Sequence, residues 1–140
     1  MGFLIDTGPL IDLERGTSDF GTLLARVENE PLFLAAVTAS ELLHGVHRAD
    51  SAVRRGRREK FVEWVLDRIP TLPFDLEVAR FYAQIWADLV KQRRRIGAHD
   101  TMIAATALAH GLTVLTTNGK DFGNVEGLSV FVWKADPAAT

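Results

Sequence analysis

The chain has 140 residues, of which 47% are hydrophobic and 24% charged, and it contains no cysteine. This composition is typical of one globular domain with a buried core, excludes a disordered chain, and leaves no thiol for disulfides or metal sites. The net charge of −2 argues against indiscriminate nucleic-acid binding, and the first residues lack the features of a signal peptide. We therefore expect a single domain over residues 1–140 that is soluble and cytoplasmic, with no membrane partner.

Short apolar runs alternate along the chain with longer segments of helical spacing. Strands are expected at residues 2–5, 32–36, 71–74, 112–117 and 128–133. Helices are expected at residues 9–15, 18–29, 38–49, 55–69, 75–94 and 99–110. Short buried strands separated by helices indicate an α/β fold, a three-layer α/β/α sandwich with a central parallel sheet. In such folds the functional site lies beyond the carboxyl ends of the strands.

Four acidic residues lie where expected strands end or helices begin: Asp6, Glu41, Asp100 and Asp121. Each has an ordinary structural explanation. Asp6 can cap the helix that follows it, and Thr38 with Glu41 matches a T-x-x-E capping box. Asp100 suits the first turn of a helix because of the helix dipole, and Asp121 suits a turn.

Taken together, the four acids call for a further explanation, because the expected topology can bring all of them to one edge of one sheet. Clustered carboxylates raise one another's pKa values, so stability alone does not explain the cluster, whereas a bound divalent cation relieves the repulsion. Oxygen-only ligands favour Mg²⁺ or Mn²⁺ over Zn²⁺. Such a site suits hydrolysis of a phosphodiester by a metal-activated water.

Positive charge is concentrated in two runs that hold nine of the sixteen Lys and Arg residues: Arg54, Arg55, Arg57, Arg58 and Lys60, and Lys91, Arg93, Arg94 and Arg95. Each run alone is typical of a solvated helix face. Two runs in a slightly acidic protein also allow a local surface for a polyanion, whose binding would then depend on salt.

Other chemistry is less well supported by the sequence. Glu41, His44 and His47 share one expected helix, but the two histidines are three residues apart, whereas paired zinc ligands such as those of HExxH are four apart. Neither a GxxxxGK[ST] loop, a GxGxxG turn after a strand nor a GxSxG elbow is present.

Four sequence blocks, taken in order, resemble one known family. The blocks "FLIDTGPLIDLERG", "VTASELLHGVHRA", "IGAHDTMIAATALAHGLTVLTTNGKDF" and "VEGLSV" are similar in order and spacing to the PIN-domain family, and most closely to the VapC-type toxins of bacterial toxin–antitoxin pairs. The resemblance covers nearly the whole chain. It implies a small α/β/α sandwich, Mg²⁺- or Mn²⁺-dependent cleavage of RNA, inhibition by a cognate antitoxin protein, and pairing into a homodimer.

The resemblance also implies a role for each acid by matching position. Asp6, Glu41 and Asp100 correspond to the first, second and third metal-binding acids of the family. The fourth is Asp121, or Asn118 where some relatives carry an acid, or both through water. Gly8 departs from the Asn or Ser that many relatives have, so the hydrogen bond to the first acid must come from elsewhere, with Thr7 and Thr116 as candidates.

Two alternatives to a toxin remain. One is a PIN-domain nuclease that processes RNA outside a toxin–antitoxin pair. The other is a catalytically inert interaction module, in which the acids are caps and the apolar stripes at residues 61–69 and 81–89 serve a partner. A receiver-like phosphorylation domain is disfavoured because the segment at residues 50–59, "DSAVRRGRRE", cannot supply its middle strand.

Overall fold

The computed structural model of the protein describes residues 1–134. The strands are β1 (Phe3–Ile5), β2 (Leu32–Ala35), β3 (Thr71–Leu72), β4 (Thr113–Thr116) and β5 (Val130–Val132). The helices are α1 (Thr7–Arg15), α2 (Phe20–Arg26), α3 (Ala36–His47), α4 (Ala52–Arg68), α5 (Leu76–Lys91), α6 (Ala98–His110) and the short 3₁₀ helix η1 (Phe122–Asn124). Every strand and helix expected from the sequence is present.

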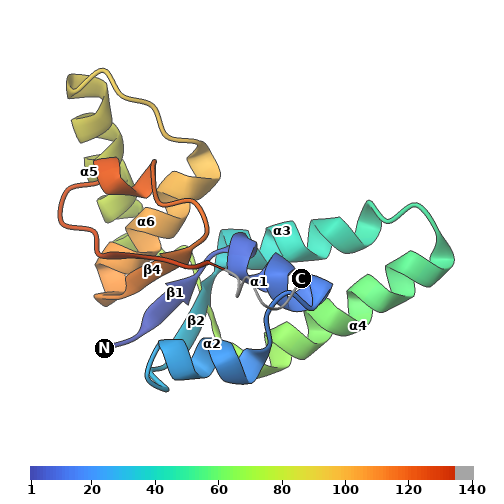
Figure 1. Ribbon diagram of the computed structural model, residues 1–140. Coiled ribbons are helices and arrows are strands. Elements are labelled where there is room, and N and C mark those ends of the chain that lie inside the picture. Colours follow the sequence, from blue (N-terminus) through green and yellow to red (C-terminus); the bar gives the residue numbers. More distant parts are fainter. Residues whose placement is uncertain (135–140) are drawn as a thin grey trace.

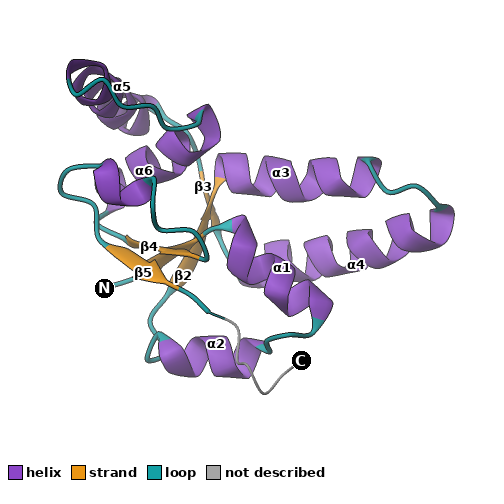
Figure 2. Ribbon diagram, turned by 45° about the horizontal axis from the view of Figure 1, so that its top comes forward, coloured by secondary structure: helices purple, strands orange, loops and turns teal. Residues whose placement is uncertain are grey.

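The five strands form one parallel sheet in the order β3-β2-β1-β4-β5, with β1 at its centre. Helices lie on both sides of the sheet (Figures 1 and 2). The predicted three-layer α/β/α sandwich with a central parallel sheet is therefore confirmed. Parallel strands require crossover connections, and here helices supply them and cover both faces of the sheet.

Consecutive side chains of the central strands point to opposite faces and so build two hydrophobic cores. Leu4 and Val114 pack with α5 and α6 on one face, whereas Ile5 and Leu115 pack with α1, α2 and α4 on the other. All four side chains are fully buried. This two-sided burial explains why the strands read as continuous apolar runs and not as alternating patterns.

Helices α3 and α4 form an antiparallel pair that projects from the body of the protein (Figure 1). We call this pair the α3–α4 arm. Val62 and Val65 in the second half of α4 are fully buried, so they anchor the arm to the core, while the first turns of α4 are exposed. The side chain of Ser51 caps α4 by accepting a hydrogen bond from the backbone N–H of Arg54 at 3.1 Å.

Helix α3 begins two residues earlier than its sequence indicates, and the predicted capping box is absent. Its N-cap is Ala35, which makes no side-chain capping bond. Thr38 lies inside the first turn, fully buried, and its hydroxyl has no hydrogen-bond partner among residues 1–134. The structure therefore contradicts the capping explanation for Glu41.

Helix α5 ends at Lys91, three residues before the end of its helical pattern, and Arg93 then adopts a left-handed backbone conformation with φ of 56°. The backbone N–H of Arg94 donates to the carbonyl of Leu89 at 2.9 Å and closes the helix end. Gly111, with φ of 64°, ends α6 as predicted. Within residues 1–134, none of the helices combines the length and apolar character needed to cross a membrane.

Candidate functional site

Asp6 lies where β1 ends, beside the carboxyl end of the neighbouring strand β4. Its Oδ1 accepts a hydrogen bond from the backbone N–H of Thr7 at 2.8 Å, so it caps α1. Its Oδ2 accepts a hydrogen bond from the hydroxyl of Thr116 at 2.9 Å. Thr116 is fully buried at the end of β4. The sequence indicated Thr7 and Thr116 as supports for this acid, and both contact it.

Gly8 leaves room for Thr117 beside the first turn of α1. A Cβ added at Gly8 would lie 2.0 Å from the hydroxyl oxygen and 2.9 Å from the Cβ of Thr117. The side chain of Thr117 therefore occupies the space that a Cβ at position 8 would need. This packing explains the departure from the Asn or Ser that the family pattern has there.

We expect Gly8→Ala to lower the free energy of unfolding by about 1–3 kcal/mol, because the added methyl overpacks this contact. Chemical denaturation measures the change. Thr117→Ala in the same chain should recover part of the loss, since it removes the hydroxyl that the methyl meets. Gly56→Ala is the control: a Cβ at this exposed position of α4 meets nothing within 4 Å, so it should not destabilise the protein. Equal effects of the two glycine substitutions would contradict this packing.

Asp100 lies in the first turn of α6, and the pKa of its carboxyl responds to the charges of the other acids. Burial raises the pKa of its carboxyl, and the charges of Asp6, Asp121 and Glu41, in this order, raise it further, while His99 lowers it. The fold therefore places the four acids predicted from the sequence close enough to repel one another. The segments that carry these four acids are far apart in the sequence.

Glu41 is held by a histidine that the sequence analysis did not consider. Its Oε1 lies 2.8 Å from Nδ1 of His99, which immediately precedes Asp100. The two side chains are partly exposed, at 31% for Glu41 and 60% for His99. Because they lie 58 positions apart in the chain, only the approach of α3 to α6 pairs them.

The side chains of Asp121 and Asn118 differ in the contacts that they make. The Oδ1 of Asn118 accepts a hydrogen bond from the backbone N–H of Lys120 at 3.4 Å, and its backbone N–H donates to the hydroxyl of Thr116 at 3.1 Å. Asp121 makes no capping bond to η1, and its charge acts on Asp100. The geometry thus favours Asp121 as the fourth member of the acid cluster and Asn118 as a turn residue.

The donor set of this acid cluster suits a hard divalent cation. In the described part of the chain, no three His, Asp or Glu side chains stand close enough together to hold one ion. Mg²⁺ does not need three protein ligands, because it keeps several waters and is commonly bound by one or two carboxylates and substrate phosphates. One or two of these carboxylates would therefore suffice, on the protein side, to hold Mg²⁺ or Mn²⁺.

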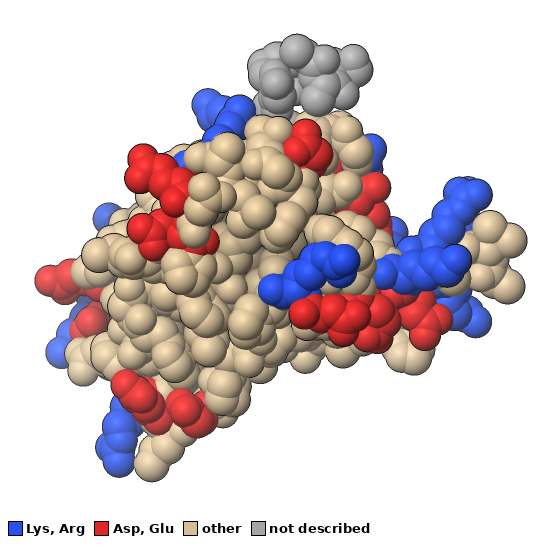
Figure 3. Space-filling model, turned by 90° about the horizontal axis from the view of Figure 1, so that it is seen from below, with Lys and Arg blue, Asp and Glu red and all other residues tan. Residues whose placement is uncertain are grey.

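A groove runs from the acid cluster along the α3–α4 arm. Glu41 and Thr7 line it at one end, and Arg48 and Arg58 line it farther along. Two arginines of the arm are paired: Arg58 with Glu14 at 2.7 Å and Arg54 with Asp50 at 2.9 Å. Figure 3 shows basic side chains of the arm next to acidic ones. Part of the first basic run is therefore neutralised.

The five-stranded parallel sheet lies between two helical layers, and the acids converge beyond the ends of its strands. This arrangement is the one expected of a PIN domain. The model of the PIN domain family matches residues 3–128, and the chain belongs to this family. Ribonuclease VapC1 of Rickettsia felis is 40% identical to it over 93% of this chain and 95% of its own length.

Two solved structures are also similar to the chain. The VapBC2 structure from Rickettsia felis bound to a promoter DNA fragment has a TM-score of 0.86 at 20% identity, covering 96% of this chain and 100% of that one, which supports the fold. A member of the VapBC family of toxin–antitoxin systems from Mycobacterium tuberculosis, VapBC-5, has a TM-score of 0.72 at 28% identity, covering 95% of this chain and 97% of that one.

Proposed function

We propose that this protein is a Mg²⁺- or Mn²⁺-dependent endoribonuclease that acts as the toxin of a type II toxin–antitoxin pair. The observation that carries the proposal is the placement of Asp6, Asp121 and Glu41 around the partly buried carboxyl of Asp100, within a chain that the PIN domain family model matches over residues 3–128. The chain's similarity to a ribonuclease VapC over nearly its whole length supports the same reaction.

The proposed roles follow from the contacts of each acid. Asp6 and Asp100 hold the cation, and Glu41 and Asp121 complete or orient the cluster. The hydroxyl of Thr116 fixes one oxygen of Asp6, and His99 fixes one oxygen of Glu41. When bound, the ion supplies Lewis acidity toward the phosphate and lowers the pKa of a water. The residues of the chain contribute placement and negative charge.

The partners follow from the same assignment. The substrate is RNA, and the inhibitor is an antitoxin protein, as the similarity to a member of a toxin–antitoxin system supports. We further propose that residues 1–140 form a single PIN domain, that two copies pair as a homodimer, and that the protein acts in the cytoplasm, where its RNA substrates are.

We expect expression of this chain in a bacterial host without an antitoxin to arrest growth. The same host should grow normally when the chain carries Asp6→Asn, since the arrest depends on cleavage of RNA. Co-expression of a cognate antitoxin should restore growth. Growth curves and RNA gels from the same cultures measure both effects.

The outcome of this experiment separates the alternatives. An RNA-processing nuclease outside a toxin–antitoxin pair would cleave RNA in Mn²⁺ but would need no neighbouring antitoxin for the host to grow. An inert interaction module would show no metal-dependent RNA cleavage in an antitoxin-free preparation. Either result would contradict the toxin assignment.

A further inference from the structure

A second cleft lies between the end of α5 and the start of α6. It has a volume of about 580 Å³, and we call it the α5–α6 cleft. Its lining includes the aromatic residues Tyr82 and Trp86 and the three consecutive arginines at positions 93–95. Ala98 and Thr101 also line it, so it borders the turn of α6 that carries Asp100.

The charge of the α5–α6 cleft is positive and uncompensated. In the part of the chain that the structure describes, no acidic residue lines it. Among residues 1–134, the ion pairs include none of its three arginines, in contrast to Arg54 and Arg58 on the arm. Guanidinium groups without a carboxylate partner suit the phosphates of a polyanion.

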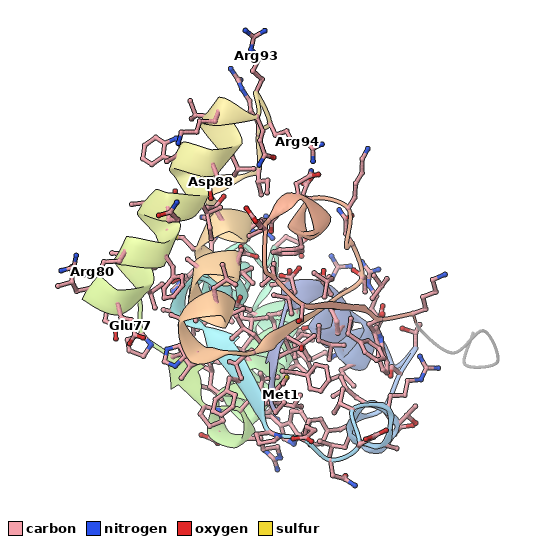
Figure 4. The ribbon with its side chains drawn as sticks, turned by 90° about the vertical axis from the view of Figure 1, so that its left-hand side faces the viewer. Met1, Glu77, Arg80, Asp88, Arg93 and Arg94 are labelled. Atoms are coloured by element: carbon pink, nitrogen blue, oxygen red, sulfur yellow. The ribbon has the colours of Figure 1, made fainter. Side chains whose placement is uncertain are left out.

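The three arginines lie on a backbone segment of defined conformation. Arg93 adopts φ of 56°, a conformation that Gly or Asn adopts more readily after a helix. Arg94 donates a hydrogen bond to Oδ1 of Asn124 in η1, which ties the cleft to the segment that follows Asp121. Figure 4 shows Arg93 and Arg94 at the C-terminal end of α5 and Arg80 near its other end.

Trp86 offers an aromatic surface at the mouth of the α5–α6 cleft. It is 62% exposed, and its ring packs edge to face against that of Tyr82, with the centroids 6.1 Å apart. Tyr82 in turn packs against Phe74 at 5.8 Å. This chain of rings supports the tryptophan from one side and leaves it accessible to a ligand from the other.

We propose that the α5–α6 cleft binds single-stranded RNA beside the acid cluster, with an unpaired base stacked on Trp86 and neighbouring phosphates bound by Arg93 and Arg95. Stacking on an exposed aromatic side chain requires bases that are not already paired within a duplex. Because the cleft borders the turn of α6 that carries Asp100, an RNA strand that lies in it is near the acid cluster. This inference rests on the proposed ribonuclease function and extends it to where the substrate lies.

The test uses the Asp6→Asn protein, which we expect to bind RNA without cutting it, and a fluorescent single-stranded oligoribonucleotide of about 12 nucleotides. Trp86→Ala should weaken binding about 10-fold or more, while Trp86→Phe should retain most of the affinity. Arg93→Gln with Arg95→Gln should weaken binding and reduce the slope of log affinity against log salt by about 1.4, which is roughly 0.7 for each lost phosphate contact. Arg94 is not substituted, because it donates a hydrogen bond to Asn124.

Arg80→Gln is the control for a general loss of charge, since it removes one positive charge from α5 near the end of the helix opposite Arg93 and Arg94 (Figure 4). It should leave both affinity and salt slope nearly unchanged. A duplex of the same sequence should bind more weakly than the single strand. Melting temperatures of all variants exclude loss of folding as the cause.

Three results would overturn the inference. If the parent cleaves RNA but the cleft variants bind as tightly as Arg80→Gln, the α5–α6 cleft is not the substrate path, and the proposed function stands. If Trp86→Ala changes the oligomeric state in analytical ultracentrifugation, this face belongs to an interface between copies of the chain. If the parent neither binds nor cleaves RNA in Mn²⁺, the proposed function fails as well.

Discussion

Asp6→Asn is expected to reduce metal-dependent RNA cleavage by more than about 100-fold, because the loss of a supporting residue around a metal already costs 10- to 100-fold and Asp6 is a direct ligand in our proposal. The fold should survive the change. Asn is as good an N-cap as Asp, and its amide oxygen can still accept the hydrogen bond from the backbone N–H of Thr7. Initial rates of RNA cleavage at saturating Mn²⁺ measure the effect.

Asp19→Asn is the matched control for this substitution. Asp19 is also an N-cap, since its carboxylate accepts a hydrogen bond from the backbone N–H of Thr22 at 2.7 Å, but it is exposed at the start of α2 and is not among the acids that act on Asp100. It should leave cleavage unchanged. A fully active Asp6→Asn protein would show that Asp6 is only a capping residue.

Asp100→Asn is expected to stabilise the metal-free protein at neutral pH and to remove its stabilisation by metal. The pKa of Asp100 is raised by burial and by its acidic neighbours, so the folded state favours the protonated carboxyl. That contribution to stability is complete at acidic pH and is lost as the pH rises through the folded-state pKa. At neutral pH the ionised carboxylate therefore destabilises the fold, and the neutral amide does not.

Thermal melts with a chelator should show Asp100→Asn melting about 2–4 °C above the parent at pH 7, with the difference shrinking as the pH falls through the pKa of Asp100. Addition of Mn²⁺ should reverse the order. The parent should gain about 4 kcal/mol at a free-metal concentration a thousand-fold above the dissociation constant, and the variant should gain far less. Equal stabilisation of both proteins by Mn²⁺ would place the ion elsewhere.

Much of the fold could be predicted from local signals. Each strand is a short apolar run, and Asp6, Ser51 and Gly111 mark helix ends much as their residue types suggest. The convergence of the acids could also be anticipated, because carboxyl ends of parallel strands meet at one edge of a sheet. All four acids were ambiguous, since caps, helix starts or turns and a metal site predict acidic residues at the same positions, and for Glu41 the competing explanation was a capping box.

The tertiary structure removed the capping explanation for Glu41 and revealed contacts that no local pattern encodes. Helix α3 begins at Ala36, which removes the capping role of Glu41, and α6 brings His99 to it at 2.8 Å. The two basic runs look alike in sequence, but Arg58 in one pairs with Glu14 on α1, while Arg94 in the other bonds Asn124.

The sequence by itself determined the order of the elements, the parallel sheet and the candidate acids, because hydrophobic periodicity and helix caps act over a few neighbouring residues. Only the tertiary structure decided which side chains support each acid, which arginines remain unpaired, and that Trp86 faces a cleft beside Asp100. These features depend on the approach of helices distant in the chain, and that approach is set by how the two cores pack against the sheet and not by any single segment.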